Sequence, residues 1–392
     1  KMKFNIYIKG RAWSFQLAES LNKKNNLHYL ITSYPKFYTN KYGIPYNKVK
    51  SFFIIELFQK IFLKISYYLN KFFNISLYIY TINICDLISD YIHSLFINKS
   101  SNIYILGFGN STCKILKELK KKNIPSIYFL NNCSDNFFDK ILEEENAKFG
   151  IKNHTVNTFV RERVNKSIQE SDYIGAISSF QAKTYIDDGI IDESKILINP
   201  LGVNTKLFKP NPKHNYKFIV TCVANDVIRK GLVYLIEAYN SLSLENAELW
   251  LIGSFDQNLL SKISNLKENN KIIGLVNEFK LVNYYNESSV FCLPTLEDGG
   301  PMVIPQAMSC GIPVISSKYC IAPDLITSGQ EGYIIDPRNT KEIAEKIKFL
   351  YDNPNERSLM GKMGRKKIEE IGTWDNVSER LIDFFNKKLK LK

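Results

Sequence analysis

The alternation of strand-like and helix-like segments constrains this chain more than any other feature of its sequence. Short apolar runs, often rich in isoleucine and valine, are separated by longer segments in which apolar residues recur at helical spacing. The predicted strands cover residues 3–8, 27–32, 102–106 and 124–130 in the first half, and 216–226, 247–253, 270–276, 290–294 and 313–315 in the second. Strands that alternate with helices predict parallel sheets with helices on both faces, the doubly wound α/β class.

The length of 392 residues favours two domains, because a single hydrophobic core stops growing at roughly 250–300 residues. The prolines in "FKPNPK", residues 208–213, mark a linker between two such sheets. We therefore expect a first Rossmann-like domain over residues 1–207 and a second over residues 208–373, facing each other across a cleft. In open parallel sheets a ligand binds beyond the carboxyl ends of the strands, so the cleft is the expected site.

The cysteines and the first residues bear on the compartment. The seven cysteines include no C-x-x-C pair and no Cys/His cluster at ligand spacing, which argues against a disulfide framework and a structural zinc site. The first ten residues, "KMKFNIYIKG", show no apolar signal core. These features predict a reducing, cytoplasmic setting.

The net charge of +13 suits an anionic partner, either nucleic acid or a membrane surface. No basic helix at groove-reading spacing and no zinc-finger or RNA-binding signature occurs, so no nucleic-acid partner is expected. In residues 51–73, helical spacing gathers apolar side chains on one stripe, with Lys60 and Lys71 on the far side and Lys64 at its edge. The pattern fits an amphipathic helix lying on the inner face of the cytoplasmic membrane, or a helix packed in a domain core.

The stretch "LPTLEDGGPMVIPQAMSCGIPVISS", residues 293–317, sets an acid, two glycines and an amide side chain between two strands. Gly299 and Gly300 leave the backbone bare where a helix could begin, and Pro301 suits the first helical position. Such a helix start can bind a phosphate. Asp298 could accept hydrogen bonds from sugar hydroxyls and Gln306 could bond a ribose, but the spacing also suits Asp298 as an N-cap and Gln306 as an ordinary helix residue.

A basic pair stands at the start of another predicted helix. In "RKGLVYLIEAY", Arg229 and Lys230 precede an apolar helix, and two cations together with the helix dipole could hold a diphosphate. A basic pair before a glycine is also typical of a solvated turn. The spacing alone leaves both interpretations open.

Several of these stretches resemble the retaining family 4 glycosyltransferases, which have the two-Rossmann GT-B fold. The C-terminal signature of that family is similar to "PTLEDGGPMVIPQAMSCGIPVISS" followed by "GQEGYIIDP". "NPLGVNTKLFKP" resembles its interdomain segment, "RKGLVYLIEAY" its diphosphate-binding helix start, and "LWLIG" with "IGLV" its nucleotide-base loops. "TWDNVSERLIDFF" resembles its final helix, expected at residues 374–392, which packs back on the first domain. The likeness covers nearly all of residues 150–390.

The resemblance implies roles for particular residues. Lys230, helped by Arg229, would clamp the diphosphate, and Asp298 would complete the catalytic set with them. The residues implied around the donor are Asn225, Gly253, Gly274, Leu275, Val276, Gly299, Gly300, Pro301 and Gln306. Acceptor specificity is expected in first-domain loops, including "GRAWSF" and "GFGNST", and the acceptor-side candidates are Gly10, Arg11 and Asn131. For Gly10 and Arg11 a plain strand-to-helix turn is the alternative.

The chain departs from the family pattern at four places. Asp298 and Gln306 stand where the family usually has glutamates, and Asn225 stands where it usually has an arginine. Asn131 aligns with the usual histidine of the first domain. Pro305 falls inside the expected helix, where it removes one N–H and should kink or loosen that helix.

The resemblance and the residues together predict a glycosyltransferase. It would move a hexose or N-acetylhexosamine from a nucleotide diphosphate sugar, with retention, to a cell-surface polysaccharide, a lipopolysaccharide core or a lipid-linked acceptor. No Asp-x-Asp metal motif follows a strand, and Lys230 with the helix end would neutralise the diphosphate, so the enzyme is expected to be metal-independent and to need no cofactor. Two alternatives stay open: a sugar epimerase of the same fold, and a degenerate GT-B protein that binds glycans or nucleotide sugars without turnover.

Overall fold

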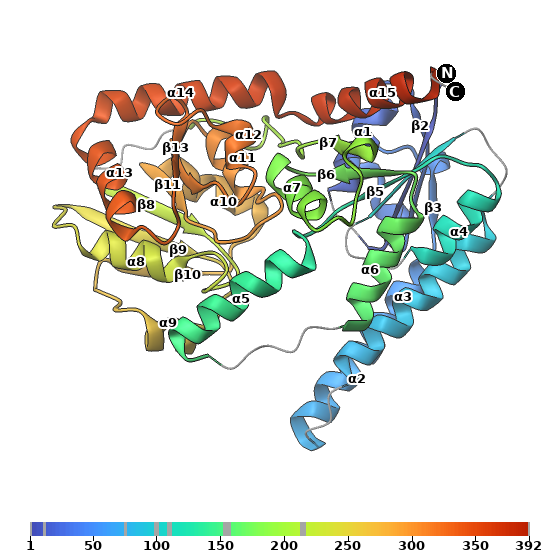
Figure 1. Cartoon of the computed structure of the whole chain (residues 1–392), viewed down its shortest axis with the longest axis horizontal. Coiled ribbons are helices and arrows are strands. Elements are labelled where there is room, and N and C mark those ends of the chain that lie inside the picture. Colours follow the sequence, from blue (N-terminus) through green and yellow to red (C-terminus); the bar gives the residue numbers. More distant parts are fainter. Residues whose placement is uncertain are drawn as a thin grey trace.

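The computed structural model describes residues 2–10, 13–73, 77–97, 102–107, 112–151, 158–211 and 217–390. Its strands form two separate sheets, and each pairing between the described strands is parallel. The seven-stranded sheet belongs to the first half of the chain and the six-stranded sheet to the second, with helices packed around both (Figure 1). The predicted doubly wound α/β architecture is confirmed.

The first sheet has the strand order β3-β2-β1-β4-β5-β6-β7. Its strands are β1 (Phe4–Ile8), β2 (Leu27–Thr32), β3 (Val49–Ser51), β4 (Ile103–Gly107), β5 (Ser126–Phe129), β6 (Tyr173–Ala176) and β7 (Ile196–Ile198). The helices of this half are α1 (Ser14–Lys23), α2 (Phe53–Phe73), α3 (Tyr78–Leu95), α4 (Cys113–Lys121), α5 (Asp135–Phe149), α6 (Thr158–Glu170) and α7 (Ser179–Asp187). Alternate residues of β1 point to opposite faces, so Phe4 and Ile6 pack with α1 whereas Tyr7 packs with α4.

The second sheet has the order β10-β9-β8-β11-β12-β13. Its strands are β8 (Phe218–Val223), β9 (Ala247–Ile252), β10 (Asn270–Gly274), β11 (Val290–Leu293), β12 (Val314–Ser317) and β13 (Gly332–Ile335). Its helices are α8 (Leu232–Asn240), α9 (Gln257–Ile263), α10 (Glu278–Glu287), α11 (Val303–Ser309), α12 (Ala322–Leu325), α13 (Thr340–Asp352) and α14 (Pro354–Ile371). Strands β8, β9 and β10 follow one another toward one edge of the sheet. Strand β11 then pairs with the other side of β8, and β12 and β13 follow toward the opposite edge. Strands β8 and β11 therefore flank the topological switch point, where ligands bind in open sheets of this kind.

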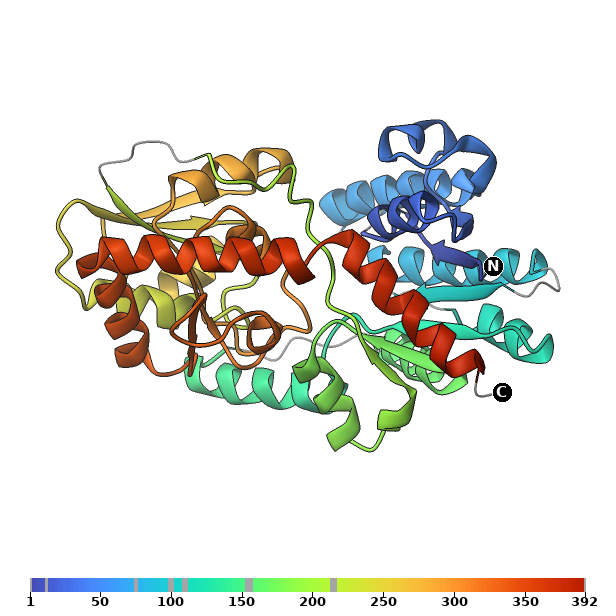
Figure 2. The ribbon, with the colours of Figure 1, turned by 90° about the horizontal axis from the view of Figure 1, so that it is seen from above.

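The last helix, α15 (Trp374–Lys390), returns from the second domain to the first. Figure 2 shows α14 lying over the second domain and α15 continuing over the first. Val377, Leu381 and Phe385 are fully buried in the core that also holds Phe4, and the Phe385 ring meets the Phe4 ring edge-on at 5.9 Å. The expected return of the C-terminal helix is confirmed.

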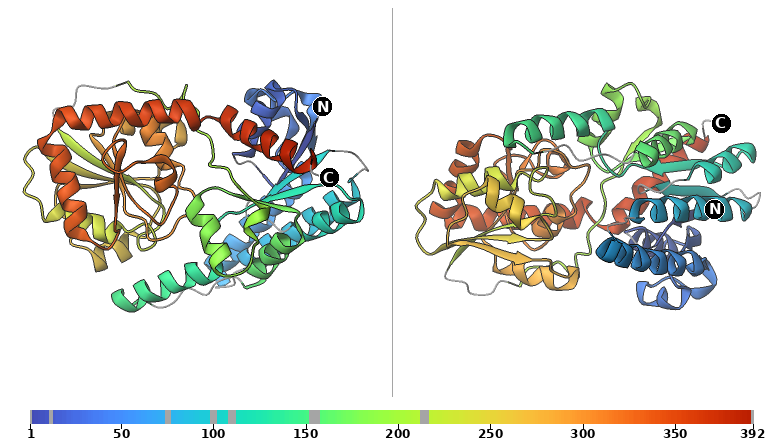
Figure 3. Two further views of the ribbon diagram at one scale, coloured as in Figure 1. Left: turned by 45° about the horizontal axis from the view of Figure 1, so that its top comes forward. Right: turned by 90° about the horizontal axis from the view of Figure 1, so that it is seen from below.

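Helix α5 joins the two halves in a way that the sequence did not indicate. It follows β5 of the first sheet but runs alongside the second domain (Figure 1, Figure 3). Glu145 of α5 is buried, accepts a hydrogen bond from Tyr234 Oη at 2.6 Å and pairs with Arg338 Nε at 2.7 Å. Both partners belong to the second domain. The division at residues 207 and 208 stays a prediction, with the two sheets on either side of it.

The apolar stripe predicted in residues 51–73 does not enter a domain core. Among the described side chains of α2, Ile55 and Ser66 alone are buried. Ile54, Phe58 and Ile61 of the stripe are each about half exposed. The alternative of a helix packed in a core is therefore wrong for this segment.

Candidate active site

A cavity of about 440 Å³ opens at the switch point of the second sheet. Residues that follow β8, β9 and β11 form one side of its wall, and first-domain residues that follow β5 and β6 form another. The predicted site residues on this wall are Asn225, Arg229, Lys230, Gly253, Leu275, Asp298, Gly300, Pro301 and Asn131. The two sheets thus bring together, at their carboxyl edges, most of the residues that the sequence proposed.

Lys230 reaches this cavity because of the glycine that follows it. Helix α8 begins directly after Gly231, whose φ is +68°. A Cβ at Gly231 would lie 2.0 Å from the carbonyl oxygen of Pro294, so a side chain there would force the backbone apart. The glycine lets the start of α8 approach the end of β11, which carries the loop with Asp298.

Lys230 and Asp298 form an ion pair on the cavity wall. Only 8% of the lysine side chain and 16% of the aspartate side chain are exposed. The second carboxylate oxygen of Asp298 accepts a hydrogen bond from the Gly300 N–H at 3.2 Å. Asp298 therefore holds the ammonium group in place and shapes its own loop. It is not the N-cap of α11, because that position belongs to Met302.

Glu297, which the sequence analysis did not select, forms a second ion pair. Its Oε2 lies 3.0 Å from Arg229 Nη1, and its Oε1 accepts a hydrogen bond from the Cys133 N–H of the first domain at 3.1 Å. The glutamate side chain is 1% exposed. The sequence contained a signal for it, the acidic doublet directly after a predicted strand. Spacing does not say which acid of the doublet meets which cation.

Arg229 keeps its charge although most of its side chain is buried. Burial acts to lower the pKa of the guanidinium, but the nearby carboxylates of Glu297 and Asp298 outweigh burial and raise it. The backbone carbonyl of Arg229 accepts hydrogen bonds from Leu296 N at 2.9 Å and from Thr295 Oγ1 at 3.1 Å. The two loops that carry the cations and the acids are therefore joined by backbone bonds as well as by charge.

Gly299 and Gly300 lie against the first domain. A Cβ at Gly299 would be 2.4 Å from Gln181 Nε2, and a Cβ at Gly300 would be 2.3 Å from Ile177 Cγ2. Ser178 Oγ donates to the carbonyl of Gly299 at 2.5 Å. The missing side chains thus permit the close approach of the two domains. A role of these glycines in a phosphate cradle stays a prediction.

Helix α11 begins two residues later than the sequence predicted. Pro301 precedes the helix, whose first residue is Val303, instead of occupying its first position. Pro305 therefore lies in the first turn, where a backbone N–H has no partner inside the helix. Ile304 N donates to the carbonyl of Pro301 at 3.1 Å, and α11 is continuous to Ser309. The expectation that Pro305 would loosen this helix is wrong for that reason.

Gln306 lies apart from the wall that carries Lys230. It is buried in α11 and lines a neighbouring cavity of about 350 Å³. Its Oε1 accepts a hydrogen bond from Tyr285 Oη at 3.4 Å. Trp13 and Met302 line both cavities, so the two spaces adjoin each other.

Only some of the residues in the predicted nucleotide-base loops line the main cavity. Gly253 and Leu275 line the main cavity, and Leu275 is 81% exposed. Gly274 and Val276 are not among the residues that line it. A Cβ at Gly253 would lie 1.6 Å from the carbonyl oxygen of Ala224, so this glycine lets the ends of β8 and β9 pack together.

The first domain contributes Asn131 and Trp13 to the cavity wall. Trp13 belongs to the "GRAWSF" loop and stacks on Trp374 of α15 at a centroid distance of 5.9 Å. The sequence analysis quoted this loop but did not select its tryptophan. Gly10 is not among the lining residues, and Arg11 lies outside the described residues.

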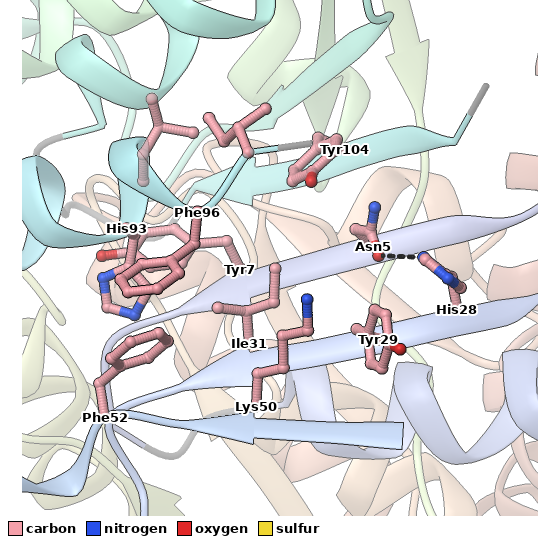
Figure 4. A pocket seen from close by; sticks show the side chains of 12 residues that line it. Asn5, Tyr7, His28, Tyr29, Ile31, Lys50, Phe52, His93, Phe96 and Tyr104 are labelled. Atoms are coloured by element: carbon pink, nitrogen blue, oxygen red, sulfur yellow. Dashed lines mark hydrogen bonds between the residues drawn. The ribbon is translucent and has the colours of Figure 1, made fainter. Parts of the chain in front are cut away.

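A smaller cavity of about 190 Å³ lies between α3 and the first sheet (Figure 4). Strand residues such as Asn5, Tyr7 and Tyr104 face His93 and Phe96 across it. None of the predicted site residues lines it. Over the ranges that the structure describes, no three His, Cys, Asp or Glu side chains gather as they would around a metal ion.

Comparison with known proteins finds a family model that matches part of the second half of the chain. Residues 203–367 match the model of the glycosyl transferases group 1. The MMP alpha-(1->4)-mannosyltransferase of Mycolicibacterium hassiacum is 25% identical over 237 residues, which are 59% of this chain and 57% of that protein. The capsular polysaccharide biosynthesis glycosyltransferase CapM of Staphylococcus aureus is 28% identical over 181 residues, 45% of this chain and 48% of that protein. The chain spans about half the length of these curated relatives.

The likeness in structure extends over both domains. HepE of Anabaena, solved in complex with UDP and glucose, superposes with a TM-score of 0.68 at 14% identity, over 99% of this chain and 100% of that one. At this identity the likeness shows the fold alone. The chain therefore has the two-domain GT-B fold, and its residues 203–367 are similar to the glycosyl transferases group 1.

Proposed function

We propose that the protein is a retaining glycosyltransferase. It moves a hexose or N-acetylhexosamine from a nucleotide diphosphate sugar to a cell-surface glycan or a lipid-linked acceptor. The observation that carries the proposal is the meeting of Lys230, Asp298 and Asn131 around one cavity between the domains. The relatives support it, because one is named a mannosyltransferase, another acts in capsular polysaccharide biosynthesis, and the HepE structure holds UDP and glucose.

The diphosphate of the donor lies beside Lys230 and Arg229 in this proposal. In the structure Asp298 and Glu297 balance these two cations. The ammonium group of Lys230 has three N–H donors, so it can hold Asp298 and a phosphate oxygen together. Arg229 stays paired with Glu297 and acts on the diphosphate chiefly as a nearby fixed positive charge.

The remaining parts of the donor follow from this placement. The base lies toward the exposed Leu275, and Asn225 faces the same space from the end of β8. The ribose extends past Met302, which lines both cavities, toward Gln306. The sugar lies toward Asp298 and the first domain, where its hydroxyl groups donate to the carboxylate.

The transfer step breaks the bond between the anomeric carbon and the diphosphate oxygen. A bond forms from the same carbon to the hydroxyl oxygen of the acceptor, on the same face of the sugar, and the proton of that hydroxyl leaves with the diphosphate. Negative charge grows on the leaving group, and Lys230 with Arg229 stabilises it. No side chain acts as a nucleophile. The protein holds the acceptor beside the departing group.

We propose that turnover needs no metal ion, because Lys230 and Arg229 line the cavity in which the leaving group would lie and could balance its charge. Activity that persists in EDTA would support this. Activity that EDTA abolishes and Mg²⁺ restores would contradict it.

The test of the function measures release of nucleoside diphosphate from a panel of nucleotide sugars and acceptors. Product mass and the anomeric coupling constant then identify the sugar and the stereochemistry. The Lys230→Ala variant should release far less nucleoside diphosphate than wild type. The Lys262→Ala variant, changed at an exposed lysine of α9, should release as much as wild type. Thermal shifts with donors but no release would favour a binding protein without turnover, and an inverted product would overturn retention.

A further inference from the structure

Helices α2 and α3 form a hairpin with an apolar, exposed outer face. Figure 1 shows the far end of α2 projecting beyond both sheets. More than half of the large apolar and aromatic side chains that the described residues expose lie on these two helices. On one stripe of α2, Ile54, Phe58, Ile61, Ile65 and Phe72 are 45–67% exposed. Such a density of exposed apolar surface marks an interaction site.

Helix α3 continues this surface. Ile84, Ile88, Tyr91 and Leu95 follow one face of the helix and are 45–63% exposed. Between the two helices lies a groove of about 410 Å³, and no charged side chain lines it. The two apolar stripes meet at this groove, because Ile54 and Phe58 of α2 and Ile84 and Ile88 of α3 all line it.

A row of lysines borders the apolar stripe of α2. At 100° per residue, Lys60, Lys64 and Lys71 fall on one flank of the helix, with Lys64 at the edge of the stripe and Lys71 and Lys60 farther round from it. All three are exposed. Glu56 is the acid of this helix, and it is half-buried and pairs with Lys60 at 3.1 Å.

The acids of α3 point inward. Asp86 is buried and pairs with Lys9, and Asp90 is buried and pairs with Arg163 Nη2 at 2.9 Å. The outer face of the hairpin therefore combines apolar side chains with lysines and presents no exposed acid.

We propose that this outer face docks on an anionic lipid bilayer and lies in its interfacial layer. Acidic headgroups meet the lysine row, and the apolar stripes with their groove enter the boundary of the acyl chains. Within the described ranges, no helix is long and apolar enough to cross a membrane. A second copy of the chain fits this face less well, because an isologous contact would bring two lysine rows together without acids to balance them.

The hairpin is tied to the edge of the first sheet that faces the cavity. The Gly10 N–H donates to Ser33 Oγ at 2.7 Å, and Ser33 Oγ donates to Glu56 Oε2 in the first turn of α2 at 3.3 Å. Lys9, beside Gly10, pairs with Asp86 of α3. Docking would therefore hold the acceptor side of the cavity near the bilayer. This last step rests on the proposed function and favours a lipid-linked acceptor.

Vesicle flotation tests the docking without donor or acceptor, so its result is independent of turnover. The wild-type protein should float with vesicles of phosphatidylcholine and phosphatidylglycerol but not with phosphatidylcholine alone, and added salt should weaken binding. Lys60→Glu, Lys64→Glu and Lys71→Glu together should reduce binding about a hundredfold, at roughly fivefold for each lysine near the surface. Ile61→Ser with Ile65→Ser should also reduce it, because apolar burial is lost while the lysines remain.

A matched triple variant separates the hairpin from overall charge. Lys262→Glu, Lys341→Glu and Lys362→Glu change the net charge equally at exposed sites on the second domain and should leave binding unchanged. Equal losses in both triple variants, or no binding of wild type to anionic vesicles at low salt, would overturn the proposal. A dimer in sedimentation that Ile61→Ser with Ile65→Ser dissolves, without lipid binding, would assign the face to a second copy instead.

Discussion

Glu297 and Arg229 form a 3.0 Å ion pair in which the same carboxylate also binds the Cys133 N–H across the domain boundary. Glu297→Gln keeps the shape and can keep the bond to Cys133, but it removes the charge that balances Arg229. Because one partner of a buried pair is then left unbalanced, we expect a loss of about 2–4 kcal/mol in the free energy of unfolding. A lower thermal midpoint would show it.

The double variant Arg229→Gln with Glu297→Gln is the control for this prediction. It removes both charges, so much of the lost stability should return. If the double variant is as unstable as the sum of the two single variants, the two charges are not coupled and the ion pair does not account for the lost stability.

Lys230→Ala should slow nucleotide release by about 10²–10³, the usual effect of removing an electrostatic donor to a developing charge. The overall fold should persist, but some stability should be lost because Asp298 is left without its ion-pair partner. Thermal unfolding and donor titration check this. Full activity in the variant would remove Lys230 from the diphosphate site.

Arg229→Ala asks whether this arginine compensates for Asn225. Loss of rate would support compensation only if Arg229→Lys, which keeps the charge beside Glu297, recovers most of it. Unchanged release in Arg229→Ala would mean that Arg229 has a structural part only. Thermal unfolding of the same variants separates the two effects.

The sequence predicted the alternating architecture, and the family resemblance placed Lys230 and Asp298 at one site, although it did not predict their ion pair. Residues at the carboxyl ends of neighbouring parallel strands must come together once the switch point is fixed. The partner of Arg229 could not be predicted, since adjacent acids on a loop point in directions that spacing does not determine. The close approach at Gly300 depends on the first domain, which the local sequence does not encode.

The positions of helices α2 and α5 in the molecule could not be predicted from the local sequence either. An amphipathic pattern is identical whether its apolar stripe meets a core, a partner or lipid, so the sequence left the place of residues 51–73 open. The burial of Glu145 against Tyr234 and Arg338 joins segments far apart in the chain. Such contacts depend on the packing of both domains, which a local pattern does not contain.

His93 should make the protein sensitive to acid. Its ring packs edge-on against Tyr7 and Phe52 (Figure 4). Its Nδ1 donates to the Ser89 carbonyl at 2.6 Å. Burial lowers its pKa from 6.5 to about 4, although the bond to Ser89 acts in the opposite direction. Above pH 6.5 His93 is neutral in both the folded and the unfolded chain, so the full free energy of unfolding is present. As the pH falls from 6.5 through 4, the unfolded chain binds a proton that the folded chain does not bind, and the free energy of unfolding decreases.

The loss from His93 should reach about 2 kcal/mol at pH 5 relative to pH 8. Other groups titrate in this range, so the measurement is the difference between wild type and His93→Phe, which preserves the ring contacts. The midpoint of urea unfolding should fall less in the variant between pH 8 and pH 5. Parallel curves for the two proteins would show that folding does not lower the pKa of His93.

Gly300→Ala should disturb the approach of the two domains without replacing a charged side chain. The added Cβ would meet Ile177 Cγ2 at 2.3 Å, so the domains must separate or Ile177 must move. Both domains line the cavity, and a displacement of about 1 Å between reacting groups can reduce turnover about a hundredfold. Adding Ile177→Ala removes the clashing methyl and should restore much of the activity, whereas Ile177→Ala alone should change it little. Wild-type kinetics in Gly300→Ala, or no recovery in the double variant, would show that the contact with Ile177 is not what requires a glycine at position 300.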